Sequence, residues 1–517
     1  MSIVRSRLKL DPELPDYPTM VHALAFAAGH APDRTAIICR DKSINFAQYA
    51  RGAAGLAETL KSRGAQGGRI AIMMNSSIEM ALACHGGMLA GTQIAPMNPF
   101  YTASEARPLL ADADPAVIVT EPGLAEFAQA RADEAGIKEV LVLGDGGMDP
   151  AAWYDDPGLV LGNDLPGPDD PSAMFFTGGT TGVPKGAEHD HKMMISYCKQ
   201  TLSVWPMRMD QETILSVAPM FHVWGHHFAL LMPVYLRATL VSVPQYKPDI
   251  VLDQFERHRV TIFAGGPAAF YVGMLRSPAM ESADLSALRY CLAGGSACPE
   301  AMLTEWEDRT GCAILEGIGM SEGAPIASNP VNGETKILSV GIVPAETSIK
   351  IVDIETGDKL LPAGERGEIC VQGPQFTFGY RNRPDETAIA IRDGWLHTGD
   401  IGYFDEDEYL FVVDRKKEMI LTGGYNVYPR EVDEVLNGHS AVFEVATVGA
   451  PDDFRGEIIK AFVALTPGAA ATEQELIDYC AERLVKYKVP AAIDFLDALP
   501  KTGANKIDKL KLKGLKE

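Results

Sequence analysis

A glycine-rich stretch at residues 177–186 brings together the residue types that could bind a polyphosphate. Four glycines, three threonines and Lys185 follow an apolar run at residues 174–176, which predicts the end of a buried strand. Backbone N–H groups, hydroxyls and an ammonium in one flexible loop can all donate to the same anion. The stretch is not a Walker loop, because Lys185 is followed by Gly186 rather than by Ser or Thr. A glycine-rich surface turn is the alternative, but this particular string favours a triphosphate-binding loop.

Six further motifs follow this loop in a fixed order. They are residues 218–222 (APMFH), 293–297 (AGGSA), 316–322 (EGIGMSE), 394–400 (GWLHTGD), 414–418 (DRKKE) and 500–506 (PKTGANK). One such match arises easily by chance, whereas the ordered set does not. Together with the loop, the motifs resemble those of the adenylate-forming enzymes, which include acyl-CoA synthetases, peptide-synthetase adenylation domains and luciferases. The resemblance covers nearly the whole chain.

The resemblance implies a reaction in two halves. A carboxylate attacks the α-phosphorus of ATP to give an acyl-adenylate and pyrophosphate, and a thiol then displaces AMP to give a thioester. The first half brings anionic oxygens together, so it needs cations and hydrogen-bond donors where charge develops. The residues that resemble the family's ATP site are Thr177, Gly178, Gly179, Thr180, Thr181, Gly182, Lys185, Gly295, Ser296, Ala297, Glu316, Gly317, Ile318, Gly319, Met320, Ser321, Asp400, Arg415 and Lys506.

The resemblance also implies separate roles within this set. The loop threonines and Lys185 would hold the β- and γ-phosphates. Glu322, with Thr177, would carry Mg²⁺, which accepts few protein ligands and takes its other oxygens from phosphate and water; a helix-capping glutamate is the alternative. Asp400 would accept the ribose hydroxyl protons, supported by Arg415, although a lone aspartate after Thr-Gly is commonly a turn residue.

The catalytic residues that the resemblance implies are Lys506, His222 and Glu322. The ammonium of Lys506 would bridge the attacking carboxylate and the α-phosphate, where the alternative is a solvated surface lysine. His222 would lie beside the substrate carboxylate, where the alternative is a satisfied core histidine.

A catalytic lysine close to the C-terminal end of the sequence implies a lid that moves. Lys417 is similar to the hinge residue about which family members rotate the small domain between the two half-reactions. Rotation would withdraw Lys506 and bring the CoA-binding residues Gly423, Gly424 and Tyr425 to the site. Gly424 has no side chain to block a pantetheine arm, and hinge motion of this kind is typical of enzyme lids.

The acyl pocket is the least readable part of the sequence. We expect small glycines beside a tryptophan to leave room for an apolar body, and no acidic or amine-binding residue marks an amino-acid substrate. The sequence therefore favours a fatty acid of medium to long chain, with a benzoate- or cinnamate-like acid as the alternative. The predicted lining residues are His222, Val223, Trp224, Gly225, His226, Gly265, Gly266 and Met320.

The sequence departs from the family pattern at four positions. Gly178 stands where serine is common, which removes one hydroxyl donor. Glu316 and Ile318 replace the usual Gln and Tyr, so aromatic stacking on adenine is lost. Asn505 replaces a glycine before Lys506, and asparagine tolerates a left-handed backbone better than other side chains do.

The elements that must position these motifs alternate between helix and strand. Helical spacing at residues 46–60, ended by Gly64, precedes a predicted strand at 69–74, a helix at 78–90 and a strand at 92–96. The alternation returns at strands 214–217, 239–243 and 261–264, with helices at 225–235 and 251–259 between them. From about residue 340, short runs at 348–352 and 367–371 predict a small β-rich part.

These patterns predict an α/β fold. We expect a large N-terminal domain, residues 1–413, made of two α/β subdomains and a small β-barrel-like subdomain at about 340–413. We expect residues 414–517 to form a small, mobile α+β lid that carries the catalytic lysine.

Composition limits the class and the partners. A chain of 517 residues is too long for one core, and a net charge of −23 argues against nonspecific binding to nucleic acid or anionic lipid. The eight cysteines show no metal-ligand spacing, which predicts reduced and mostly buried thiols. The first residues lack the apolar stretch that is typical of a signal peptide, and Pro233 and Arg237 interrupt the most apolar region. We therefore expect a cytoplasmic protein with no integral membrane segment, for which a homodimer is a possible assembly.

The function that the sequence indicates is a Mg²⁺- and ATP-dependent acid–CoA ligase that releases AMP and pyrophosphate. No carrier domain follows in the sequence, so free CoA is the expected acceptor. A ligase that stops at the adenylate or loads a carrier-protein thiol is the near alternative. A noncatalytic nucleotide sensor and a luciferase-like oxygenase are alternatives of other classes, because a fold does not fix a function.

Overall fold

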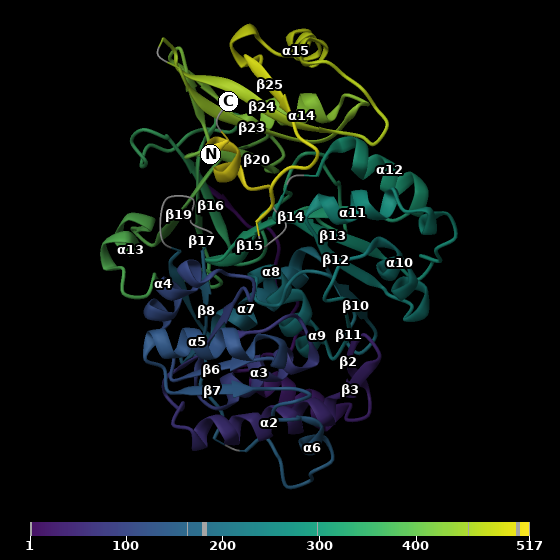
Figure 1. Ribbon diagram of the computed structural model, residues 1–517, viewed down its shortest axis with the longest axis vertical. Helices are drawn as coiled ribbons and strands as arrows, with labels where there is room; N and C mark the ends of the chain where they lie inside the picture. The colour runs from purple at the N-terminus through teal and green to yellow at the C-terminus, as the bar shows by residue number, and fades with distance from the viewer. Residues whose placement is uncertain are drawn as a thin grey trace.

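Four β-sheets and the helices that cover them make up the described part of the chain (Figure 1). The computed structural model describes residues 3–162, 164–177, 184–296, 298–452, 454–502 and 507–515. Several residues named above lie outside these ranges: Gly178, Gly179, Thr180, Thr181, Gly182, Ala297, Asn505 and Lys506.

The first α/β sheet has the strand order β7-β6-β4-β5-β8-β9 and is parallel except for β9. Its strands are β4 (Arg69–Met73), β5 (Gln93–Met97), β6 (Val117–Thr120), β7 (Glu139–Val142), β8 (Pro171–Phe176) and β9 (Gly186–Asp190). The helices of this part are α1 (Met20–His30), α2 (Phe46–Ser62), α3 (Ile78–Leu89), α4 (Ala103–Ala113), α5 (Ala125–Ala135), α6 (Ala151–Tyr154) and α7 (His191–Val204). A capping box of Asn45 and Gln48 begins α2, and Ser77 caps α3.

The second α/β sheet has the order β15-β14-β13-β12-β10-β11-β2-β3, with antiparallel strands only at its two ends. Its strands are β2 (Thr35–Cys39), β3 (Lys42–Asn45), β10 (Thr213–Ser216), β11 (Thr239–Ser242), β12 (Ile262–Gly266), β13 (Tyr290–Gly294), β14 (Ile314–Met320) and β15 (Gly323–Ser328). Its helices are α8 (Val223–His226), α9 (Met232–Leu236), α10 (Pro248–Arg257), α11 (Ala268–Leu275) and α12 (Glu300–Thr310). A π-helical turn, His227–Leu231, joins α8 to α9, so the helix predicted at 225–235 is present but wider in its middle.

The third sheet is antiparallel and includes the N-terminal strand. Its order is β1-β16-β17-β19-β18, with β20 also paired to β19. The sequence analysis predicted β16 and β17 but not that the chain start would join them. The bounds are β1 (Ile3–Arg5), β16 (Ser348–Val352), β17 (Gly367–Gln372), α13 (Pro384–Ala390), β18 (Ile391–Arg392), β19 (Trp395–Phe404) and β20 (Leu410–Arg415).

The C-terminal part forms the fourth sheet and lies at one end of the molecule, at the top of Figure 1. The strand order is β22-β21-β24-β23, with β25 parallel to β24. Its elements are β21 (Ile420–Thr422), β22 (Tyr425–Val427), α14 (Pro429–Asn437), β23 (Val442–Asp452), β24 (Gly456–Leu465), α15 (Glu473–Ala481), β25 (Ala492–Phe495) and α16 (Lys509–Gly514). The predicted division at residue 414 falls within β20, and it stays a prediction.

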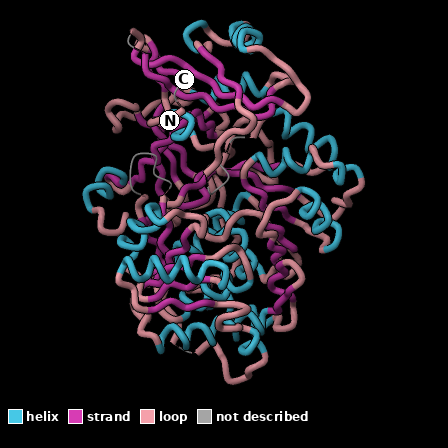
Figure 2. The backbone as a smooth tube through the Cα atoms, viewed as in Figure 1, coloured by secondary structure: helices cyan, strands magenta, loops and turns pink. Residues whose placement is uncertain are grey.

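One large apolar core joins the two α/β sheets. It contains residues of α2, α3, α7 and the 223–236 helix as well as of the strands, as expected for helices that cover mostly parallel sheets. Figure 2 shows the helices around the strands in the lower part of the molecule. The predicted fold class, a mixed α/β chain with a large N-terminal and a small C-terminal domain, is confirmed.

Two smaller expectations concern thiols and membrane spans. All eight cysteines are buried and unpaired, as predicted. Within the ranges described above, none of the helices combines the length and the apolar composition needed to cross a bilayer.

Candidate active site

The glycine-rich loop spans the end of a hairpin rather than a strand-to-helix turn. β8 and β9 pair antiparallel as far as Phe176 and Gly186. Beyond this pair, Thr177 N donates to the carbonyl of Lys185 at 2.9 Å, and Lys185 N donates to Thr177 Oγ1 at 3.3 Å. The two residues therefore close the neck of the loop, which fixes where the Thr177 hydroxyl and the Lys185 side chain leave the sheet.

The Lys185 ammonium has two neighbours in the segment around α13. Its Nζ lies 2.6 Å from Glu386 Oε2 and 5.1 Å from the centre of the Tyr380 ring. The Tyr380 hydroxyl donates to Glu322 Oε1 at 2.6 Å. Tyr380 thus connects two residues that the sequence analysis had assigned to phosphate and to metal.

Glu322 lies in the turn between β14 and β15 and is only 6% exposed. Its backbone carbonyl accepts from Thr377 N at 2.7 Å, which holds the turn in place. Burial raises the pKa of Glu322, while the Tyr380 hydrogen bond and the Arg415 charge oppose that rise. The buried Glu322 carboxylate and the Thr177 hydroxyl are oxygen ligands of the kind that Mg²⁺ takes, so the chemistry of these two residues fits this ion.

Asp400 and Arg415 face each other across β19 and β20. The strand register pairs them directly, and Arg415 Nε lies 3.2 Å from Asp400 Oδ1. Asp400 N donates to Thr398 Oγ1 at 3.0 Å. The carboxylate is buried and pairs with a guanidinium, and its oxygens are acceptors of the kind that the predicted ribose contact needs.

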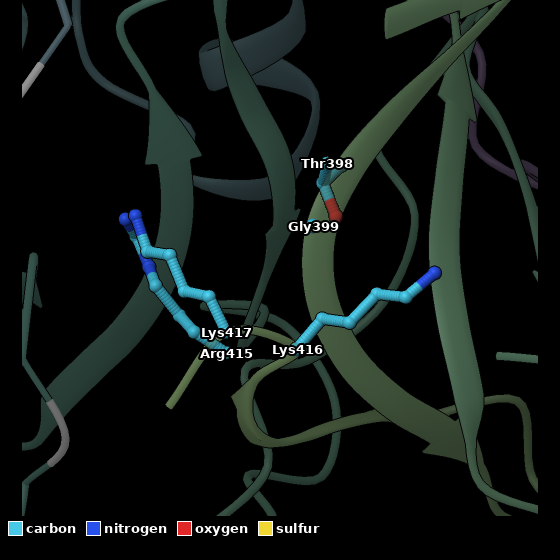
Figure 3. A pocket seen from close by; sticks show the side chains of 5 residues that line it. All are labelled: Thr398, Gly399, Arg415, Lys416 and Lys417. Atoms are coloured by element: carbon cyan, nitrogen blue, oxygen red, sulfur yellow. The ribbon is translucent and has the colours of Figure 1, made fainter. Parts of the chain in front are cut away.

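A cavity of about 290 Å³ adjoins this pair (Figure 3). In Figure 3, Arg415 and Lys417 extend to one side and Lys416 to the other. Lys416 Nζ lies 3.3 Å from Glu368 Oε2. Partial burial and the Arg415 charge lower the pKa of Lys417, and the charges of Asp400 and Glu322 oppose this effect. Lys417 therefore lies within electrostatic reach of both carboxylates. The cavity is lined by Thr398, Gly399, Arg415, Lys416 and Lys417.

The predicted ATP-site residues after β13 and in β14 differ in their burial and in their hydrogen-bond partners. Gly295 has φ of +83°, and Ser296 Oγ accepts from Ala268 N at 3.1 Å. Glu316 is 5% exposed, and its Oε1 accepts from Cys298 N at 3.1 Å. Burial raises the pKa of Glu316 to about 7. The Glu316 carboxyl therefore already binds the backbone of the loop after β13.

The remaining predicted residues of this segment lie along β14 and in the turn that follows it. Gly317 is buried, Gly319 is exposed, and Ile318, Met320 and Ser321 are half-buried. Met320 and Ile318 pack against the core of the antiparallel sheet.

Trp224 occupies the ends of the central strands of the second sheet. A Cβ added to Gly294, at the end of β13, would lie 2.5 Å from Trp224 Cζ3, and one added to Gly266, at the end of β12, would lie 3.5 Å from Trp224 Nε1. Trp205 and Phe228 pack on the indole at ring distances of 6.3 and 4.7 Å. The indole therefore occupies the room that we expected beside the glycines, and the absence of a side chain at Gly294 lets the ring lie this close to β13.

The other predicted acyl-site residues are divided between the strand ends and the core. His222 caps α8, where its Nδ1 accepts from Trp224 N at 3.3 Å, and Val223 is the buried first residue of that helix. A Cβ on Gly225 would lie 2.0 Å from the carbonyl oxygen of Pro219, and one on Gly265 would lie 2.7 Å from Phe263, so both glycines allow close packing.

His226 was predicted to line the acyl pocket, but its side chain lies in the buried core. It is buried with its ring 5.0 Å from that of Phe175, and burial lowers its pKa to about 3. The imidazole is therefore neutral in the core, where it packs on β8.

The predicted CoA residues form a turn on the lid. Gly423 and Gly424 connect β21 to β22 with φ of +56° and +83°, and no atom lies within 4 Å of a Cβ built on either. Tyr425 is exposed and stacks on Tyr487 at 4.5 Å.

Lys506 itself lies outside the described residues, but its flanks are described. On one side, Lys501 Nζ lies 2.5 Å from Glu444 Oε1. On the other side, Lys509 Nζ lies 3.4 Å from Glu418 and 3.7 Å from Asp433. The sequence motifs did not include Tyr380, Glu386 or Lys509. Their contacts join residues that are distant in the sequence or that lie outside any motif.

The chain is similar to known proteins over nearly its whole length. The chain matches the AMP-binding enzyme family over residues 24–381 and the AMP-binding enzyme C-terminal domain over residues 431–506. It is 33% identical over 527 residues to a long-chain-fatty-acid–CoA ligase of Bacillus subtilis (strain 168), covering 96% of this chain and 94% of that protein. It is 35% identical over 486 residues to a feruloyl-CoA synthase of Amycolatopsis sp, covering 93% and 95%. The crystal structure of ATP-bound MatB from Rhodopseudomonas palustris is similar with a TM-score of 0.88 and 30% identity, covering 96% of this chain and 98% of that one.

The chain therefore belongs to the AMP-binding enzyme family. Within that family it is an AMP-forming acid–CoA ligase of the acyl or aryl type, an enzyme class that uses ATP and CoA.

Proposed function

We propose that this ligase activates an apolar carboxylic acid, a fatty acid of medium to long chain, and transfers the acyl group to CoA. The observation that carries this proposal is the apolar wall that the Trp224 indole forms at the ends of β12 and β13, with the buried rings of Trp205 and Phe228 packed on it. An uncharged wall favours an uncharged acyl body. The long-chain-fatty-acid–CoA ligase among the relatives supports the same class.

An aromatic acid is the second candidate, and one observation favours it. The Trp224 indole fills the strand ends, so a long chain must displace the ring whereas a short, flat acid can stop in front of it. The feruloyl-CoA synthase among the relatives supports this alternative.

In the adenylation half-reaction, different residues bind the phosphates, the ribose and the substrate carboxylate. Lys185 and the Thr177 hydroxyl hold the departing pyrophosphate from the β8–β9 hairpin, and Asp400 with Arg415 binds the ribose. His222 lies beside the substrate carboxylate at the start of α8. Lys506 approaches from the lid and neutralises charge between the carboxylate and the α-phosphate. Mg²⁺, held by Glu322 and Thr177, would supply further charge neutralisation at the phosphates.

In the thioester half, rotation about Lys417 exchanges the Lys506 loop for the β21–β22 turn. Gly423 and Gly424 leave the turn open, since nothing lies within 4 Å of a Cβ at either position. The stacked rings of Tyr425 and Tyr487 offer an exposed aromatic face to the CoA.

A panel of carboxylic acids tests the substrate and the acceptor together. AMP release is measured with saturated fatty acids from short to long chain, with benzoate and cinnamate, and with or without CoA. We expect the highest kcat/KM for a medium- or long-chain acid and sustained AMP release only with CoA. Highest activity on benzoate or cinnamate selects the aromatic alternative. Transfer to a carrier-protein thiol but not to CoA contradicts the proposed acceptor.

A further inference from the structure

The Lys185 ammonium is already paired with an anion that belongs to the protein. Its Nζ lies 2.6 Å from Glu386 Oε2, on the first turn of α13. The two side chains are 31% and 36% exposed. A carboxylate therefore occupies one face of the ammonium that is proposed to hold the departing pyrophosphate.

This pairing is built into the backbone around it. Residues 379–381 run beside β9, since Glu188 N donates to the carbonyl of Gly379 at 3.1 Å and Arg381 N donates to the carbonyl of Gly186 at 2.9 Å. Tyr380 N donates to Thr387 Oγ1 at 2.9 Å. These bonds fasten the start of α13 to the strand that follows Lys185, so Glu386 is held opposite the ammonium.

Tyr380 keeps the ammonium in place without competing for it. Its ring centre lies 5.1 Å from Lys185 Nζ, and its hydroxyl is engaged by Glu322 at 2.6 Å. A ring face attracts a cation whichever anion the cation pairs with. Glu386 is different, because its carboxylate and a phosphate oxygen are like charges that seek the same donor.

We propose that Glu386 is a built-in competitor of pyrophosphate for Lys185. It pairs with the ammonium in the nucleotide-free enzyme, gives way to the phosphates of ATP, and returns to Lys185 as pyrophosphate leaves. The inference rests on the proposed phosphate role of Lys185. A half-exposed ion pair is weak enough to be displaced, so the competitor lowers pyrophosphate affinity and speeds its release without blocking ATP.

The test is a titration of the full-length protein with inorganic pyrophosphate and Mg²⁺ by calorimetry. We expect Glu386→Gln to tighten pyrophosphate binding about two- to five-fold, as expected for removal of a partly exposed competing charge, and to slow pyrophosphate release in stopped flow. Asp385→Asn is the matched control, because Asp385 is the exposed neighbour on the same turn; it should leave both quantities unchanged. In a Lys185→Met background, Glu386→Gln should have no effect.

The outcomes distinguish a failure of the competitor role of Glu386 from a failure of the phosphate role of Lys185. Unchanged or weaker pyrophosphate binding by Glu386→Gln overturns the competitor, and weaker binding shows instead that Glu386 orients Lys185 for phosphate. If Lys185→Met binds pyrophosphate as tightly as the wild type, the phosphate role of Lys185 is wrong and the competitor role is wrong with it. If Asp385→Asn tightens pyrophosphate binding by the same factor, the effect comes from the general loss of negative charge. This result also overturns the proposal.

Discussion

Two buried glutamates six residues apart in the sequence, Glu316 and Glu322, have different hydrogen-bond partners. Glu322 receives the Tyr380 hydroxyl, whereas Glu316 receives the backbone N–H of Cys298. Burial raises the pKa of both carboxyls. Only Glu322 lies in the network that includes Lys185, so the chemistry of each carboxyl depends on its partner rather than on its burial.

The raised pKa of Glu316 predicts that Glu316→Gln stabilises the protein at high pH. Between the ordinary value of 4.5 and about 7, the folded state keeps a proton that the unfolded state has lost. Stability therefore falls as the pH rises through this window, by up to about 3 kcal/mol. Glutamine avoids this cost and keeps an oxygen to accept from Cys298 N. The melting temperature of Glu316→Gln should exceed that of the wild type at about pH 8, and the gap should narrow toward about pH 5.

Glu300→Gln serves as the control, because Glu300 is an exposed residue at the start of nearby α12. Its melting temperature should follow that of the wild type at every pH. If the difference in melting temperature between Glu316→Gln and the wild type does not change with pH, the Glu316 carboxyl is not the titrating group.

At the scale of elements, the proposed acyl site is a contact between one short helix, α8, and the ends of two parallel strands, β12 and β13. α8 carries Trp224 onto Gly266 and Gly294, and the indole lies so close to Gly294 that a side chain at this position would clash with it. Ligands of parallel α/β sheets bind at the carboxyl ends of the strands. In the proposed acyl site, the indole would therefore limit how far an acyl group extends along this edge.

Trp224→Ala should shift substrate preference toward longer or bulkier acids. Removing the indole opens the space beside Gly266 and Gly294, so kcat/KM for the larger acids should rise about tenfold relative to the smaller ones. The measurement is the acid panel above. Trp153→Ala is the control, since Trp153 lies on α6 and packs on α2 at Gly55. An unchanged order of substrates in Trp224→Ala would remove Trp224 from the acyl site.

At the scale of the whole molecule, the lid contacts the N-terminal part through α14 and the segment after β20. Glu431 on α14 lies 2.8 Å from Arg366, and Arg430 Nη1 donates to the carbonyl of Val412 at 2.6 Å. Near the connection between the two parts, Arg415 pairs with Asp400, and the charges of Asp400 and Glu322 act on Lys417. Both carboxylates belong to the proposed nucleotide site. A rotation about Lys417 would therefore change the lid contacts while the Asp400–Arg415 pair could stay in place.

The two half-reactions should be lost separately. Lys506→Ala should lower adenylation about 10²- to 10³-fold, as when one charge-stabilising donor is removed, and should spare CoA transfer from a supplied acyl-adenylate. Gly424→Leu should impair CoA transfer while pyrophosphate exchange persists. Gly424→Ala is the control for backbone strain, because φ at Gly424 is +83°. Equal loss of both half-reactions in Lys506→Ala would contradict its role.

The sequence by itself determined the class of this protein. Ordered motifs indicated the family, and the alternation of helix and strand periods predicted the α/β class and elements such as α2, α3, β16 and β17, because local periodicity and caps are written into neighbouring residues. The placement of His222, Glu322 and Asp400 in the site came from the same motifs, and their roles stay predictions.

Only the tertiary structure decided which residues share a partner. Tyr380 and Glu386 reach Lys185 across nearly two hundred residues of chain, Trp224 fills the space that the glycines had suggested was free, and β1 joins a sheet whose other strands begin beyond residue 340. No local pattern encodes these contacts, because they depend on how separate elements pack, and packing is decided by the shape and burial of the whole set of side chains at once.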